Sequence, residues 1–346
     1  MCGKPQVFEH PEIAVRAQRA YPTIVFLSFV AGPVLAHHSA AMFDATKTVT
    51  LEGSIERYEW ANPHVYIHLA SSSGTWVVEA GSPSLMQRVG WTPDSFAVGD
   101  VVSIDVNPTR NAERLMARGI VVRPLDGAAL PFRASLMQSP APAPAPVPAP
   151  GLGGNWLPGP QRVPSDGAST ARSPTPKGAE ALARADPENN PGIDCVALQA
   201  PAQMLFTDLK NIELDGATVV LRSAVNVGVE RIVHLDQTTH TGAPFTNDGH
   251  SIGRWDNGTL VVDTRNFTDH PSGNGGGVPS GAQKHLVEYF ELAADRTTLT
   301  YRFILEDSEY LAAPFEGSAV WEHRPDLTYT AEKCDLENAR RYLEER

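Results

Sequence analysis

An alternating Pro-Ala tract in the middle of the chain constrains its fold more than any other feature. The tract runs from Ser139 to Pro150 (SPAPAPAPVPAP). Proline lacks a backbone N–H and fixes φ, so such a tract cannot join a sheet ladder or build a core, and we expect extended polyproline II. The chain is therefore predicted to fold as two separate parts joined by a semi-rigid spacer.

The composition permits a hydrophobic core in each part and disfavours one class of partner. The chain has 346 residues, of which 42% are hydrophobic, and its formal net charge is -12. Nucleic-acid binding depends on clusters of Lys and Arg that neutralise phosphates, and the sequence contains no such cluster. We therefore expect no nucleic-acid partner.

The N-terminal segment has the features of a secretory signal peptide. Arg16 and Arg19 precede an apolar run over 23–36 (TIVFLSFVAGPVLA) that ends in small residues. This run is shorter than the about 20 residues that span a bilayer, and a Gly-Pro pair breaks it near its end. We predict cleavage after Ala36 and a periplasmic or secreted protein with no integral membrane span. An uncleaved anchor is the alternative.

The first half reads as a small β-barrel. Apolar residues alternate with a period of two in five segments, and a helix after the third segment begins with Ser82 as N-cap and Pro83. This order is typical of an OB-like barrel. The predicted division of the chain is a signal peptide at 1–36, the OB-like barrel at 37–126, a Pro/Ala/Gly-rich linker at 127–193 and an antiparallel β-domain with a C-terminal helix at 194–346.

This first half also resembles a family of uncharacterised exported proteobacterial proteins, the domain of unknown function DUF6152. The resemblance rests on AHHSAAMFD at 36–44, WANPHV at 60–65, GSP at 81–83 and GW at 90–91. It implies export and a small β-barrel, and it implies no activity.

The second half is also predicted to be β-rich. Short alternating segments follow one another from about residue 204 to 331, and the Asn257-Gly258 pair is typical of a tight hairpin turn. Because helices do not alternate with these strands, we predict an antiparallel barrel or a curved β-meander. A charged helix is expected over 336–345.

The second half resembles another family of uncharacterised exported bacterial proteins. The shared segments are GHSIGRW at 249–255, TLVVDT at 259–264, Phe267 and the region around Glu288. Where that family has an Asp-Gly-Arg, this chain has Leu-Asp-Gln at 235–237, which puts shared ligand specificity in doubt.

Two cysteines remain after removal of the segment that contains Cys2. They are Cys195 and Cys334, near the start and the end of the second domain. In an exported protein, two cysteines predict one disulfide, and two buried free thiols are the alternative.

A copper site is predicted at the mature N-terminus. Cleavage would make His37 the first residue, and its α-amine and ring nitrogen together suit Cu(II). His38 and His64 would add imidazoles. The alternative is that His37 and His38 are polar residues of a frayed terminus.

A second candidate site lies in the C-terminal β-domain. The stretch 237–282 is long and irregular, and loops of that length are usually functional or mobile. Glu288 alternates with apolar residues, so burial would raise the pKa of its carboxyl group. We predict an acid–base pair of His250 with Glu288 or Asp263. The predicted ligand-binding residues are Arg254, Trp255, His240, Asp248 and His285.

A structural role for the same carboxylates is the alternative. Glu288 would then pair with Arg254 or Arg302, and Asp263 would accept a loop N–H.

Two classes of function follow from these observations. The first is an exported protein that binds a small-molecule ligand or a metal. The second is a cofactor-free hydrolase or isomerase that acts on a small apolar molecule in the C-terminal β-domain. The sequence contains no His-Glu-x-x-His, phosphate-loop or dinucleotide-binding motif.

Overall fold

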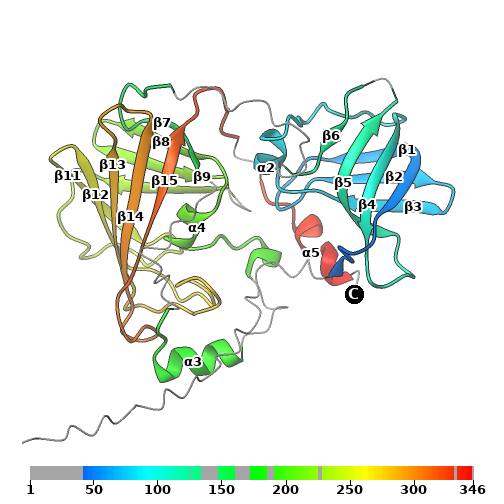
Figure 1. Cartoon of the computed structure of the whole chain (residues 1–346). Coiled ribbons are helices and arrows are strands. Elements are labelled where there is room, and N and C mark those ends of the chain that lie inside the picture. The colour runs from blue at the N-terminus through cyan, green and yellow to red at the C-terminus, as the bar shows by residue number, and fades with distance from the viewer. Residues whose placement is uncertain are drawn as a thin grey trace, which may run out of the picture. The chain divides into compact units, whose positions relative to one another are not determined.

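The computed structural model describes residues 42–125, 127–133, 147–159, 172–184, 191–224, 228–330 and 333–344. The predicted signal peptide, His37 and His38 lie outside these residues. The chain is mainly β, with an OB-like small barrel and a larger closed barrel, which confirms the predicted fold class (Figure 1).

The first barrel has OB-like topology. Its sheet order is β3-β2-β1-β4-β5-β6, and a parallel pairing of β3 with β5 closes it. Helix α2 (Pro83–Gln87) lies between β3 and β4, and the Ser82 hydroxyl accepts a hydrogen bond from the Leu85 amide at 3.4 Å. The strands are β1 (Val49–Glu59), β2 (Tyr66–Ser71), β3 (Gly74–Glu79), β4 (Val101–Pro108), β5 (Met116–Pro124) and β6 (Leu130–Pro131).

Alternate residues of these strands fill the first barrel. Ile67, Val78 and Ile104 are fully buried together with Trp91 from the segment after α2. Gly53 allows β1 and β2 to approach closely, because a Cβ there would lie 1.9 Å from the Ala70 carbonyl oxygen. The two-residue periodicity of the sequence therefore corresponds directly to the inward face of the barrel.

The second barrel is a closed ring of nine strands in the order β10-β11-β12-β13-β14-β15-β7-β8-β9. Its hairpin at Asn257 and Gly258 has the predicted positive φ at both residues. The strands are β7 (Gly154–Pro158), β8 (Lys210–Asp215), β9 (Thr218–Ser223), β10 (Val229–His234), β11 (His250–Asp256), β12 (Thr259–Arg265), β13 (His285–Leu292), β14 (Thr298–Glu306) and β15 (Phe315–His323).

One pairing in this ring differs from the antiparallel prediction. Strand directions can alternate around a closed ring only when the number of strands is even, and the nine-stranded ring includes one parallel pair, β10 with β11. A parallel pair needs a crossover connection instead of a hairpin. Residues 235–249 provide this connection, which we call the crossover loop.

The predicted linker contributes to the second barrel. The range 127–193 contains β6, β7 and helix α3 (Pro176–Ala183), and β7 pairs with β15 and β8. Trp156 of β7 is fully buried, and Ala149 at the end of the Pro-Ala tract is also buried in this core. The GNWLP segment escaped prediction because a single short run has too little alternation to indicate a strand.

Two predicted strands are wrong. The sequence predicts strands over 204–208 and 327–331, but helix α4 (Ala202–Leu205) occupies the first position and strand β8 follows it, and the described residues 327–330 form no strand. Short apolar runs do not distinguish helix from strand, because neither period can be established over a few residues.

A disulfide connects the two ends of the second half. Cys195 follows the 3₁₀ helix η4 (Pro191–Asp194), Cys334 precedes helix α5 (Leu336–Glu344), and the two cysteines are 139 residues apart in sequence. Arg340 of α5 forms an ion pair with Asp194 beside the bond. The bond therefore holds α5 against η4.

Reduction of this disulfide is expected to destabilise the protein. In the chain-entropy model, a bond that closes so long a loop stabilises by at most about 5 kcal/mol. Urea unfolding with and without reductant measures the effect. The double variant Cys195→Ser/Cys334→Ser is the control and should not respond to reductant. An unchanged wild-type midpoint after complete reduction of the bond would contradict this role.

A charged network lies inside the second barrel. Arg231 of β10 and Glu288 of β13 are 2% and 0% exposed. The Arg231 Nη1 atom is 2.7 Å from Glu288 Oε2, and Nη2 donates to Oε1 at 2.9 Å. The Tyr301 hydroxyl also donates to Oε1 at 2.9 Å. Glu288 is therefore paired with an arginine and hydrogen-bonded to a tyrosine within the core.

Breaking this pair on one side should be costly. Glu288→Leu would leave the Arg231 charge buried and unpaired, and we expect a loss of about 3–5 kcal/mol in the free energy of unfolding. The double variant Arg231→Met/Glu288→Leu should recover most of that loss, because it buries no charge. Urea unfolding of Arg231→Met, Glu288→Leu and the double variant measures the coupling between the two residues. If the stability losses of the two single variants simply add up in the double variant, the coupling is contradicted.

Candidate functional site

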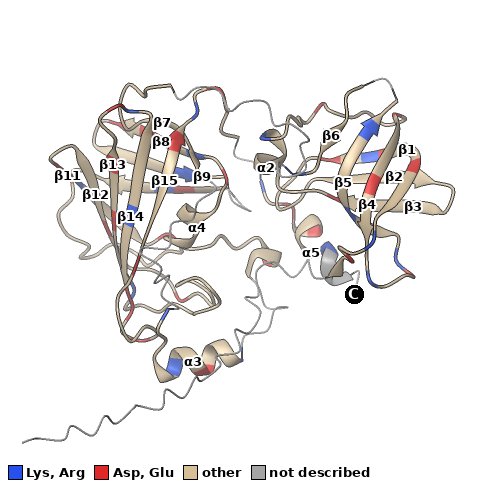
Figure 2. Ribbon diagram, in the orientation of Figure 1, with Lys and Arg blue, Asp and Glu red and all other residues tan. Residues whose placement is uncertain are grey.

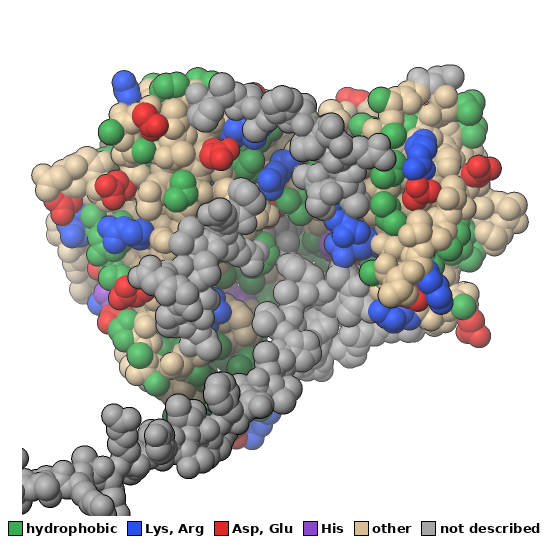
Figure 3. Space-filling model, viewed as in Figure 1, with side chains coloured by type: hydrophobic (Ala, Val, Ile, Leu, Met, Phe, Trp, Pro, Cys, Tyr) green, Lys and Arg blue, Asp and Glu red, His purple; other side chains and the backbone are tan. Residues whose placement is uncertain are grey.

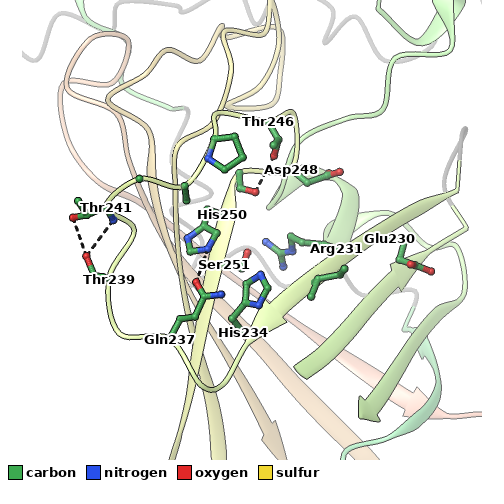
Figure 4. Close-up of a pocket in the computed structure, with 15 residues that line it drawn as sticks. Glu230, Arg231, His234, Gln237, Thr239, Thr241, Thr246, Asp248, His250 and Ser251 are labelled. Atoms are coloured by element: carbon green, nitrogen blue, oxygen red, sulfur yellow. Dashed lines mark hydrogen bonds between the residues drawn. The ribbon is translucent and has the colours of Figure 1, made fainter. Parts of the chain in front are cut away.

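A pocket of about 680 Å³ lies beside the parallel seam of the second barrel (Figure 4). Strands β10 and β11 pair only through Val233–Ser251 and His234–Ile252, so the ladder between them is short. The pocket is lined by β10, the crossover loop and the start of β11. Its size falls within the range of small-molecule sites.

Hydrogen bonds and one glycine give the crossover loop its shape. The Asn266 side-chain amide donates to the carbonyls of His240 and Ala243 at 3.2 and 3.0 Å. Gly249 has a φ of +71°, and a Cβ there would lie 2.7 Å from Thr264 Cγ2. A side chain at position 249 would therefore collide with β12. Only glycine fits where the crossover loop joins β11.

Three buried polar atoms of the pocket residues make no hydrogen bond within the described residues. They are Asp248 Oδ1, Arg231 Nε and Arg231 Nη1. Of these, Nη1 forms an ion pair with Glu288 Oε2 at 2.7 Å, whereas Asp248 Oδ1 and Arg231 Nε have no ion pair. Burial raises the pKa of Asp248, and the charge of Arg231 and a hydrogen bond from the Gln203 side chain to the carboxyl group oppose that rise. Unsatisfied buried groups are costly, so a ligand that reached both atoms would gain more than an ordinary hydrogen bond.

A chain of side-chain hydrogen bonds leads away from the pocket. The His250 Nε2 atom is 2.9 Å from Gln237 Oε1, and His250 Nδ1 is 2.9 Å from His240 Nδ1. The His240 Nε2 atom is 3.1 Å from Asp263 Oδ1, and Asp263 Oδ2 is 3.1 Å from His285 Nε2. The chain connects a pocket histidine to a carboxylate shared by two other histidines.

The donors and acceptors of this chain restrict its protonation. Asp263 accepts from His240 Nε2–H, and one of the two facing Nδ1 atoms must donate to the other. If Gln237 Oε1 accepts from His250, then either His240 or His250 donates through both of its nitrogens. If the Gln237 amide is turned round, His250 donates to His240 and remains neutral. Two of these three arrangements leave His250 neutral.

Electrostatics also favour the neutral form of His250. Burial lowers the pKa of His250, and the nearby His240 and His234 lower it further. Burial opposes ionisation of Asp263, but hydrogen bonds and positive charge from His285 and His240 outweigh it and lower the pKa of that carboxyl group. The arrangement thus favours a neutral His250 backed by an ionised carboxylate.

The structure does not join the predicted pair of His250 and Glu288. His250 contacts Gln237 and His240, whereas Glu288 contacts Arg231 and Tyr301. The alternative prediction paired Glu288 with Arg254 or Arg302. The structure pairs it with Arg231 instead. Arg302 lies over the ring of Tyr289, 4.6 Å from its centroid.

The other predicted site residues separate into two groups. His250 and Asp248 line the pocket. His240, Asp263 and His285 form the chain behind His250. Arg254 and Trp255 are exposed on the β11–β12 hairpin and are not lining residues.

The predicted copper site falls largely outside the described residues, because His37 and His38 lie there. His64 is described, and its Nδ1 atom is 3.1 Å from the Ala80 carbonyl oxygen. The described part of the chain contains no group of three or more His, Cys, Asp or Glu residues arranged to hold a metal ion. Within the same residues, no helix combines the length and apolar character needed to cross a membrane.

Among the pocket residues that sequence reasoning missed are Arg231, His234 and Gln237. A signal existed for Arg231, because it lies between Val229 and Val233 on the apolar face of its strand, as Glu288 does on its own. Opposite charges on two inward faces of one domain indicate a buried pair. His234 and Gln237 follow no pattern and are brought to the pocket by the crossover.

The comparison with known families agrees with the N-terminal resemblance. Residues 25–118 match the model of a family of unknown function (DUF6152), a range that includes β1 to β4 and the start of β5. No curated protein matches the chain.

His250 is expected to titrate below the ordinary histidine value of about 6.5. The folded protein disfavours its protonated form, so the unfolded chain binds the proton more readily and stability falls as the pH drops below about 6.5. An NMR titration of the histidine ring protons measures the pKa, with His250→Gln used to assign the resonance. Urea midpoints of His250→Gln should depend less on pH in this range. A His250 pKa above 6.5 would contradict the expectation.

Proposed function

We propose that the chain is an exported binding protein that holds a small, hydroxyl-bearing molecule in the pocket beside the β10–β11 seam. The observation that carries this proposal is the pair of buried, unpartnered atoms Asp248 Oδ1 and Arg231 Nε. A hydroxyl group donates one hydrogen bond and accepts others, so one such group can serve a carboxylate and a guanidinium together.

Other lining residues suit the same class of ligand. Gln237, Thr246 and His234 add polar groups that would orient further hydroxyls. The rings of His234 and His250 are stacked, with centroids 5.3 Å apart and an angle of 26° between their planes. The pocket therefore offers polar groups from several directions, as sites that recognise small polar molecules do.

Two observations support export. The run over 23–36 after Arg16 and Arg19 has the composition of a secretory signal. The bond between Cys195 and Cys334 is of a kind that persists in oxidising compartments. The proposed location is the periplasm or the exterior of the cell.

A second candidate is a cofactor-free hydrolase or isomerase. The chain His250–His240–Asp263 favours it, because a neutral imidazole backed by a second group and a carboxylate is a common form of general base. However, both ring nitrogens of His250 already have partners, so Gln237 would have to move before His250 could take a proton from a substrate. Binding therefore ranks first.

Thermal unfolding with monosaccharides, polyols and hydroxy acids tests the binding proposal. At least one compound should raise the midpoint by several degrees, because a ligand that binds only the folded state stabilises it. Asp248→Ala and His250→Ala should each abolish the shift. Asp256→Ala, on the exposed β11–β12 hairpin, is the matched control and should retain it.

Two outcomes would reject the proposal. One is that no compound of these classes shifts the wild-type midpoint. The other is that Asp248→Ala retains the full shift. Conversion of the bound compound, lost in His250→Gln while binding persists, would instead establish the enzyme.

A further inference from the structure

A second pocket lies in the OB-like barrel. It has a volume of about 220 Å³ and is lined by residues of β3, β5 and α2 and by the segment after β6. Three of its lining residues are arginines, namely Arg88, Arg118 and Arg133. The buried ring of Phe132 forms part of its wall. Nothing in the proposed function of the second barrel uses this pocket.

The three arginines form no ion pairs within the described residues. None of the ion pairs within the described residues includes Arg88, Arg118 or Arg133. Arg88 donates to the Thr207 carbonyl at 3.1 Å, which is a neutral acceptor.

The charges of Arg118 and Arg133 also act on each other. Burial lowers the pKa of Arg133, and the nearby charge of Arg118 lowers it further. Burial likewise lowers the pKa of Arg88, against the opposing charge of Asp208. Like charges gathered in a partly desolvated hollow repel each other, and a bound anion would relieve that repulsion.

One carboxylate also lines the pocket. Glu79 of β3 is the ladder neighbour of Arg118 on β5, and it is 1% exposed. The Tyr66 hydroxyl donates to Glu79 Oε2 at 3.5 Å, and His64 Nδ1 lies 4.0 Å from Oε1. Glu79 is thus hydrogen-bonded through Oε2, while Oε1 has no hydrogen-bond partner within the described residues. Among the lining residues, one carboxylate stands against three arginines, so the lining itself carries an excess of positive charge, although Asp208 and Glu322 also act on Arg88.

We propose that this pocket binds a small anion through a phosphate or carboxylate group, held by Arg118 and Arg133 and completed by Arg88 at the end of α2. Guanidinium groups match both anions because they donate two parallel hydrogen bonds. The volume admits a phosphate group or a small organic acid, and it excludes a folded macromolecule.

The surrounding surface supports a local site. Figure 2 shows basic positions on β5 and next to α2, with acidic positions on neighbouring strands of the same barrel. On the face shown in Figure 3, basic side chains are interspersed with acidic and apolar ones. An anion would therefore be recognised by the pocket and not by a broad basic surface.

Isothermal titration of the purified full chain with inorganic phosphate, and separately with succinate, tests the proposal. Wild-type protein should bind at least one probe saturably, more weakly as salt is raised. Arg118→Gln and Arg133→Gln should each weaken binding about tenfold or more. Arg123→Gln removes the same charge from an exposed position of β5 and is the matched control, with unchanged affinity expected.

The two probes distinguish the source of the anionic group. Binding of phosphate alone, of succinate alone or of both supports the site and identifies the chemistry that it accepts. Failure of both probes to bind saturably overturns the proposal, as does equal affinity in the Arg118→Gln/Arg133→Gln double variant. Circular dichroism of each variant establishes that the OB-like barrel remains folded. The ligand of the second barrel is tested by other variants, so the two proposals fail independently.

Discussion

A closed ring of nine strands cannot alternate in direction all the way round, and much of this structure follows from how the second barrel meets that constraint. The barrel has one parallel pair, β10 with β11, which requires the chain to cross from one end of the barrel to the other. The crossover loop makes this connection. It leaves a ladder of only two residue pairs, and the pocket lies beside that short ladder.

The buried pair of Arg231 and Glu288 connects the core of this barrel with its pocket. Two guanidinium nitrogens are used by Glu288, while Nε of the same group remains without a partner among the described residues. The carboxylate therefore has a positioning role, because it holds the arginine at the pocket. Asp248 lies in the same lining and has one similarly unsatisfied oxygen. A polar ligand would complete hydrogen bonding that the fold leaves unfinished.

The histidine chain illustrates how far residue patterns can locate a site. His240, His250, Asp263 and His285 were all predicted as site residues, and the structure connects them through hydrogen bonds. The contact between His240 and Asp263 was not predictable. The two residues are 23 positions apart in the sequence, and the path of the crossover loop brings them together. Similarly, the position of Glu288 among apolar residues indicated a buried carboxylate, while its partner lies 57 residues away on another strand.

By itself, the sequence determined the local features of this protein. Two-residue alternation determined most strands, Ser82 and Pro83 determined the start of α2, and Asn257-Gly258 determined a hairpin, because each depends on neighbouring residues alone. Tertiary structure decided the rest: the recruitment of β7 from the predicted linker, the parallel seam, the arginine partner of Glu288 and both pockets. Ring closure and the pairing of distant buried charges depend on the whole chain, and no local pattern records them.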